Sequence, residues 1–140
     1  MENQSNKWKE FSSLITDFLN SISSNSSFDY VSREITGHCL DVGCGRQNYF
    51  VKQVLKGNGK GIDVFPYEGL EPENIVEDIT NFPFSDSTFT NVTFIANINH
   101  VPKPKRDIEL SEAYRVMKPG GKIIVTMGSA IAEILVHKVV

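Results

Sequence analysis

The sequence has few cysteines, no long apolar run and no strong excess of charge. Its two cysteines, Cys39 and Cys44, lie five residues apart around a predicted strand end, a poor arrangement for a disulfide that favours a reduced intracellular state. No apolar run approaches the roughly 18 residues that a membrane span requires, and the polar start lacks the apolar stretch of a signal peptide. A net charge of -3 gives no electrostatic reason to expect a nucleic-acid partner. The 140 residues therefore predict a single-domain cytoplasmic protein.

Helical and strand periodicities alternate along the chain. Two predicted helices, at 7–19 and 29–35, make residues 1–36 a predicted N-terminal helical segment. From residue 37 onwards short apolar segments alternate with helical ones, which predicts an α/β domain with a parallel sheet and right-handed crossovers. The predicted strands are 38–42, 61–65, 74–76, 91–96 and 122–127, and the predicted helices are 47–55, 106–117 and one that begins at 129. The helix at 106–117 has one apolar stripe, formed by Leu110, Ala113, Tyr114 and Met117.

The most informative segment is the turn after the first predicted strand, Leu40-Asp41-Val42-Gly43-Cys44-Gly45. Ligands of open parallel sheets bind at the carboxyl ends of strands, and glycines there let the backbone approach a ligand closely. A dinucleotide fingerprint needs a third glycine where this chain has Asn48, so an NAD site is disfavoured. A plain strand-to-helix turn is the alternative for this segment taken alone. We interpret Cys44 as a small buried spacer rather than a nucleophile.

The segment from Asp41 to Gly45 resembles the first motif of class I S-adenosylmethionine-dependent methyltransferases. Residues 78–89 resemble the family's aspartate followed by a Leu/Phe-Pro-Phe loop, and residues 112–122 closely resemble its helix, Lys-Pro-Gly-Gly turn and fifth strand. The resemblance spans about residues 38–127 and is to the subgroup of ubiquinone-type and other small-molecule methyltransferases. It implies a three-layer Rossmann-like domain at 37–140, with strand order 3-2-1-4-5, helices on both faces and an incomplete C-terminus.

The resemblance also implies which residues bind S-adenosylmethionine. The Asp63 carboxylate is expected to accept hydrogen bonds from both ribose hydroxyls, and Asp78 with the Ile79 backbone is expected to recognise the adenine. Asn97 is expected near the reactive sulfonium end, and His100 is the only candidate general base, although a lone histidine at a strand-to-helix junction is more often structural. The full expected cofactor-binding set is Asp41, Gly43, Cys44, Gly45, Asp63, Val64, Asp78, Ile79 and Asn97, with no metal ligand.

Three nearby features have simpler interpretations. Asp63 could be a solvated strand-end residue, and Asp78 could be a loop aspartate without a function. Phe65 either packs on the adenine or belongs to the core. The basic cluster of Lys103, Lys105 and Arg106 is interpreted as solvated.

Two features depart from the family pattern. Gln47 stands where the family usually has a third glycine, and its side chain is expected to narrow the space near the methionine part of the cofactor. The chain also ends in the helix predicted after the fifth strand, which leaves that strand as a free apolar edge. Such an edge favours pairing with another chain, so we expect a homodimer or other self-association through this C-terminal edge or through the terminal helices.

Two functions stay open at this point. The first is a methyltransferase that acts on an unidentified small-molecule acceptor, which the acidic positions favour. The second is an S-adenosylmethionine-binding module without catalysis of its own, with a regulatory or subunit role, which Gln47 and the short C-terminus favour.

Overall fold

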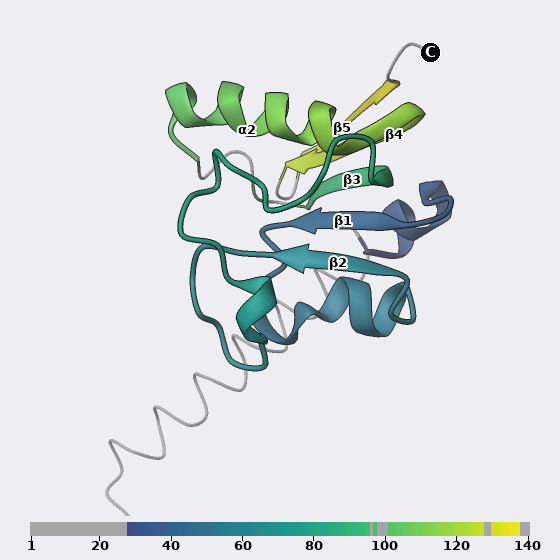
Figure 1. Ribbon diagram of the computed structural model, residues 1–140. Coiled ribbons are helices and arrows are strands. Elements are labelled where there is room, and N and C mark those ends of the chain that lie inside the picture. The colour runs from purple at the N-terminus through teal and green to yellow at the C-terminus, as the bar shows by residue number, and fades with distance from the viewer. Residues whose placement is uncertain (1–27, 96, 98–100, 128–129, 138–140) are drawn as a thin grey trace, which may run out of the picture.

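The computed structural model describes residues 28–95, 97, 101–127 and 130–137, and these residues form a three-layer α/β fold (Figure 1). Its five-stranded sheet has the order β2-β1-β3-β4-β5. The strands are β1 (Cys39–Val42), β2 (Gly59–Ile62), β3 (Phe89–Ile95), β4 (Met117–Met127) and β5 (Ala130–His137). The helical elements are residues 28–34, the 3-10 helices η1 (Arg46–Asn48) and η3 (Pro72–Asn74), the π-helix η2 (Phe50–Val54) and the α-helix α2 (Lys103–Val116).

The sheet is covered by helical segments on both faces. Figure 1 shows α2 over one face and the segment from η1 to η2 over the other. Successive residues of a strand point to opposite faces. Leu40 and Val42 of β1 accordingly belong to the core cluster under α2, whereas Cys39 belongs to a second cluster with Phe50 and Val31. The three-layer arrangement predicted from the sequence is confirmed.

The predicted strand order 3-2-1-4-5 is also confirmed. The four predicted strands at 38–42, 61–65, 91–96 and 122–127 correspond to β1, β2, β3 and β4, which pair in parallel. The predicted third strand is reduced to a single parallel bridge between Asp63 and Ile75, beside β2. In the described part of the chain, no helix is long and apolar enough to cross a membrane.

The helix predicted from residue 129 is wrong, because Ala130–His137 forms strand β5. It pairs antiparallel with β4, from Lys122 opposite His137 to Met127 opposite Ala130. A short apolar run of β-branched residues fits both periods, and the open backbone edge of β4 decides in favour of a strand. The edge that the sequence left free is therefore covered, and β5 is the outer strand.

Two predicted helices differ in detail. The helix expected at 47–55 is divided into η1 and η2, since Gln47 and Asn48 have φ angles of 60° and 48°, outside the α-helical region. Helix α2 begins at Lys103 rather than at 106, and Tyr114, expected on its buried stripe, is 50% exposed. The short helix expected at 29–35 is observed at 28–34, whereas the one expected at 7–19 lies outside the described residues.

Arg115 near the end of α2 fastens the loop that precedes β3. Its Nη1 donates to the Phe84 carbonyl and to Asp86 Oδ1, both at 2.8 Å, and its Nη2 donates to the Phe82 carbonyl at 3.1 Å. Its Nε donates to Glu112, whose other carboxylate oxygen accepts the Phe82 N–H at 2.9 Å. One guanidinium therefore holds two loop carbonyls and two carboxylates.

Candidate functional site

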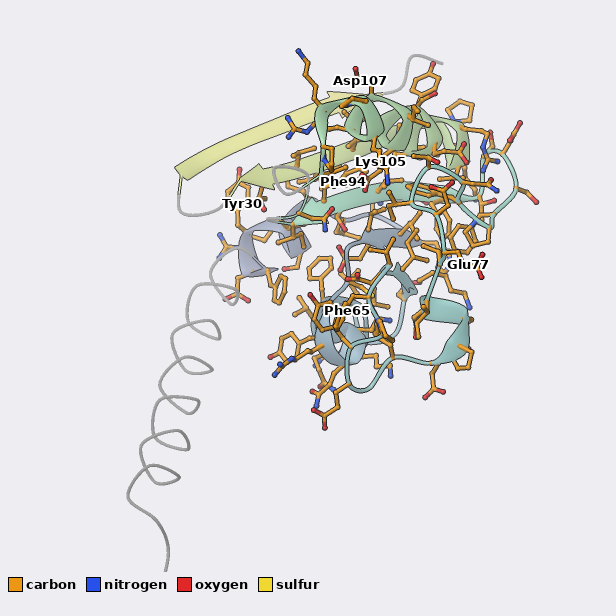
Figure 2. The ribbon with its side chains drawn as sticks, turned by 90° about the vertical axis from the view of Figure 1, so that its left-hand side faces the viewer. Tyr30, Phe65, Glu77, Phe94, Lys105 and Asp107 are labelled. Carbon is orange, nitrogen blue, oxygen red and sulfur yellow. The ribbon has the colours of Figure 1, made fainter. Side chains whose placement is uncertain are left out.

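The turns after β1 and β2 are bonded to each other at the carboxyl edge of the sheet. The N–H groups of Gly43 and Cys44 both donate to the Ile62 carbonyl, at 2.8 and 3.1 Å. The Gly45 N–H donates to Asp63 Oδ2, and the Phe65 N–H donates to Asp63 Oδ1, each at 3.0 Å. Figure 2 looks onto this edge and shows Phe65 beside the turn. The carboxylate of Asp63 thus fixes both turns.

Gly45 leaves open space in front of the turn. Its φ of 67° and ψ of -165° fall in a region that essentially only glycine adopts. A Cβ built on this residue would meet no atom within 4 Å. Asp63 beside it is 8% exposed, and each of its two oxygens accepts one backbone hydrogen bond in the structure. Since a carboxylate offers about four acceptor positions, Asp63 can accept further donors from a ligand.

A Gly45→Ala variant tests this geometry. The alanine would be held in a conformation that costs about 1–3 kcal/mol, and its methyl group would extend into the open space. We expect a lower midpoint in urea denaturation and at least a tenfold loss of affinity for an adenosyl ligand, measured by calorimetry. Gly57→Ala, another open glycine with positive φ but remote from Asp63, should show only the loss of stability. Equal affinity losses in both variants would contradict a specific role for Gly45.

Asn97, after β3, lies directly against the first glycine of the turn. A Cβ on Gly43 would overlap the amide group of Asn97, so the absence of a side chain at Gly43 is what allows the contact. The structure thus brings four of the expected site residues together: Gly43, Gly45, Asp63 and Asn97. His100 lies outside the described residues.

Gln47 occupies a backbone conformation that favours glycine. Its φ of 60° and ψ of 8° are left-handed, which accounts for the glycine that the family usually has at this position. Its N–H donates to the Glu68 carbonyl at 2.8 Å, and its Cγ lies 2.8 Å from where a Cβ of Gly69 would be. The Gln47 side chain therefore packs on the loop after β2. The narrowing expected at the methionine end of the cofactor stays a prediction.

Asp41 is buried inside the sheet layer rather than exposed at its edge. It is 2% exposed, and its Oδ1 accepts a hydrogen bond from the Thr93 hydroxyl of β3 at 2.8 Å. Burial raises its carboxyl pKa from 3.8 to about 7, and the nearby Asp63 carboxylate adds to the effect. Burial likewise raises the pKa of the Cys44 thiol to about 12, which favours the interpretation of Cys44 as a spacer.

The raised pKa of Asp41 predicts a pH-dependent stability. Between pH 3.8 and about 7 the Asp41 carboxyl keeps its proton in the native state and loses it in the unfolded state. The contribution of this group to the free energy of unfolding is therefore largest at low pH and falls as pH rises through that window. Asp41→Asn keeps an acceptor for Thr93 and is expected to raise the free energy of unfolding at pH 8 by about 2–4 kcal/mol. Urea denaturation should show this gain shrinking towards pH 4. The same gain at both pH values would contradict the explanation.

The other expected site residues lie on exposed loops. Val64 is exposed, and Phe65 is 57% exposed with its ring 4.6 Å from that of Tyr67, so the interpretation of Phe65 as core is wrong. The exposed Asp78 accepts hydrogen bonds from the Thr80 hydroxyl and N–H, which hold its pKa below the usual value. Asp78 lies at a groove of about 470 Å³, lined by Pro72, Glu73, Ile75, Val76, Glu77, Asp78, Asn81, Pro83 and Phe84. Ile79, half-buried, packs against the main core cluster.

One buried charge was missed by the sequence analysis. Glu109 of α2 is fully buried, on the same helix face as Ala113 and Val116. The spacing of three and four residues among these positions was the available signal, but a glutamate is rarely expected on a buried face. Among the described residues, no group of histidine, cysteine and acidic side chains could hold a metal ion.

Comparisons with known proteins agree with this architecture. The family model of the methyltransferase domain matches residues 40–125. The sterol 4-C-methyltransferase strm-1 of Caenorhabditis elegans is 31% identical over 103 residues, which are 63% of this chain and 30% of that protein. The demethylmenaquinone methyltransferase of Renibacterium salmoninarum is 43% identical over 51 residues, 36% of this chain and 21% of that protein. The chain thus spans about a third or less of these curated relatives.

Solved structures show the same fold at low identity. A SAM-dependent methyltransferase from Methanosarcina mazei superposes with a TM-score of 0.54 at 23% identity, covering 69% of this chain and 55% of that one. The [4+2]-cyclase SpnF superposes with a TM-score of 0.58, also at 23% identity, covering 71% of this chain and 43% of that one. A methyltransferase and a cyclase therefore share this fold.

Proposed function

This chain belongs to the class I S-adenosylmethionine-dependent methyltransferase family, and on that premise we propose that it binds S-adenosylmethionine and transfers a methyl group to a small-molecule acceptor. The observation that carries the proposal is the bond between the Gly45 N–H and Asp63, beside open space at Gly45. A backbone without a Cβ and a fixed carboxylate with free acceptor positions fit a nucleoside whose sugar offers two hydroxyl donors.

The proposed contacts assign a role to each expected site residue. Asp63 accepts the ribose hydroxyls, while the Gly43 and Gly45 backbone makes room for the sugar and the methionine part. Val64, Asp78 and Ile79 bind the adenine, with the exposed Phe65 beside them. Asp41 and Cys44 support the turn from inside the sheet. Asn97, packed on Gly43, faces the reactive end, and His100 is the proposed general base.

The chain's own contribution to catalysis is mainly orientation. The cofactor, when bound, supplies a sulfonium-activated methyl group for an in-line displacement. The fixed turn at Gly43 to Gly45 and the Asn97 contact hold that end in one place, which lowers the entropic part of the barrier. A base such as His100 is needed only for an acceptor that carries a proton of high pKa.

Calorimetry with three ligands tests the proposal. We expect S-adenosylmethionine and S-adenosylhomocysteine to bind one to one, and NAD to give no binding heat, because the chain has Asn48 where a dinucleotide site needs glycine. Binding of NAD but of neither adenosyl compound would overturn it.

A second function is favoured by Gln47, which stands at the turn where the family usually has a glycine. We propose as the alternative a module that binds the cofactor without catalysis of its own. Transfer of radiolabelled methyl from S-adenosylmethionine to reduced demethylmenaquinone would support the enzyme. Tight cofactor binding without transfer to it or to a sterol would support the module.

Self-association and location complete the proposal. We propose a cytoplasmic homodimer in which β5, the outer strand of the sheet, pairs with β5 of a second copy. The proposed cofactor-binding domain is 37–140, after an N-terminal helical segment at 1–36. Sedimentation should give a dimer at high protein concentration, and a monomer throughout would contradict this pairing.

A further inference from the structure

Two buried polar groups on the first turns of α2 have no partner among the described residues. Glu109 is 0% exposed, and in this part of the chain neither of its carboxylate oxygens has a hydrogen-bond partner. The Nε of Arg106, one helical turn earlier, is also buried and also lacks a partner among the described residues. Buried polar groups are nearly always paired, so two such groups so close together require an explanation.

The two side chains are complementary but do not pair in this structure. Residues three apart on a helix are neighbours, and an arginine and a glutamate at that spacing can form an ion pair. Arg106 instead uses its Nη2 to donate to the Val101 carbonyl at 2.9 Å. Val101 lies four residues after Asn97, the residue that packs on Gly43. Arg106 therefore ties the chain that leads from the candidate site to the helix.

Other charged groups near Glu109 are already engaged or exposed. Among the described residues, β3 carries no charge, and β4 carries Lys118, which is exposed, and Lys122, which pairs with Glu34 at 3.1 Å. Asp86, in the loop before β3, and Glu112, on α2, both pair with Arg115. On α2 itself Asp107 is exposed, and Lys105, also exposed, lies near enough to Asp78 to lower its pKa. Figure 2 shows Lys105 and Asp107 on the first turns of the helix. Among the described residues, the half-buried Arg106 is therefore the cation that remains to pair with Glu109.

We propose that Arg106 exchanges between the Val101 carbonyl and Glu109 when Glu109 loses its proton, and that this exchange frees the Val101 carbonyl just before α2. Burial raises the pKa of Glu109 to about 7, which puts the exchange close to neutral pH. Below that pH the neutral glutamate stays under α2 and Arg106 holds Val101. Above it the carboxylate draws the guanidinium away. Arg106 and Glu109 are positioning residues, and the inference does not depend on methyl transfer.

Nuclear magnetic resonance of the full chain between pH 5 and pH 9 tests the exchange. We expect the Glu109 carboxyl carbon and the Arg106 Nε to shift together with one midpoint near pH 7. Glu112 is the internal reference, because its hydrogen bonds from Arg115 lower its pKa and its carboxyl carbon should stay constant in this range. A Glu109 midpoint near the ordinary 4.5, or an Arg106 signal that does not move, would overturn the proposal.

Three variants separate the exchange from a merely structural role. Glu109→Gln keeps the side-chain shape and should abolish the Arg106 transition; a transition that survives belongs to another group, such as His100, and contradicts the proposal. Arg106→Gln removes the cation and should raise the Glu109 midpoint by about 1 pH unit. Lys105→Gln removes the same charge from an exposed position and should leave the midpoint unchanged. If Arg106→Gln and Lys105→Gln shift the Glu109 midpoint equally, the effect is general electrostatics, and the exchange of partners is contradicted.

Discussion

An Asp63→Ala variant is expected to bind S-adenosylmethionine at least about 100-fold more weakly than the wild-type chain, a loss of roughly 3 kcal/mol. Two causes add. The variant loses the acceptors proposed for the ribose hydroxyls, and it leaves the N–H groups of Gly45 and Phe65 without the carboxylate that fixes them. The turn after β1 would then lose its bond to the Asp63 side chain and keep only its backbone bonds to Ile62 and Glu68. Isothermal titration calorimetry measures the change directly.

Two further variants make this result specific. Asp63→Asn should also bind weakly, since its amide NH₂ would face one of the two backbone donors that the carboxylate accepts. Glu68→Ala removes the same charge from the same loop, and its carbonyl can still accept the Gln47 N–H, so affinity should be unchanged. If folded Asp63→Ala binds as tightly as the wild type, Asp63 does not belong to the site.

An Arg115→Ala variant is expected to lower the free energy of unfolding by about 2–4 kcal/mol, because it breaks hydrogen bonds to charged and to buried groups together. Glu112 would keep only the Phe82 N–H, and the carbonyls of Phe82 and Phe84 would lose their shared donor. Phe82 is buried in the main core cluster, so a loosened loop would also disturb the packing under α2. Thermal denaturation should show a fall of about 10 °C.

Charge alone does not explain the role of Arg115. Arg115→Lys keeps the charge but lacks the planar fork that reaches four acceptors, so most of the loss should remain. Arg33→Ala, an exposed arginine on the helix at 28–34, should leave the melting temperature nearly unchanged. Full rescue by lysine would contradict the proposed geometry.

The parts of the fold that depend on local sequence could be predicted. Strand and helix periodicities alternate from residue 38 onwards, and together with the family resemblance they gave the three layers and the strand order. Gly43 and Gly45 marked the turn of the candidate site, and both adopt positive φ, a conformation that glycine readily permits. Asp63 followed from its position at the end of the next strand.

The parts that depend on tertiary contacts could not be predicted. Residues 130–137 fit a helix as well as a strand, and only the open edge of β4 makes them a strand. The buried face of α2 was predicted only in part: Ala113 and Met117 are buried as expected, whereas Tyr114 is exposed. Glu109 is buried although a tyrosine suits a core better than a glutamate does. The burial of Asp41 against Thr93, and its raised pKa, required the register between β1 and β3.

A crystal structure of the chain soaked with S-adenosylhomocysteine is the most direct test of the proposed site. The sugar hydroxyls should lie within hydrogen-bonding distance of both Asp63 oxygens, with the ligand passing in front of Gly45 and its sulfur towards Asn97. Electron density for the ligand at another place, or a turn closed by the side chain of Gln47 with no ligand bound, would show that this family fold does not hold the cofactor here.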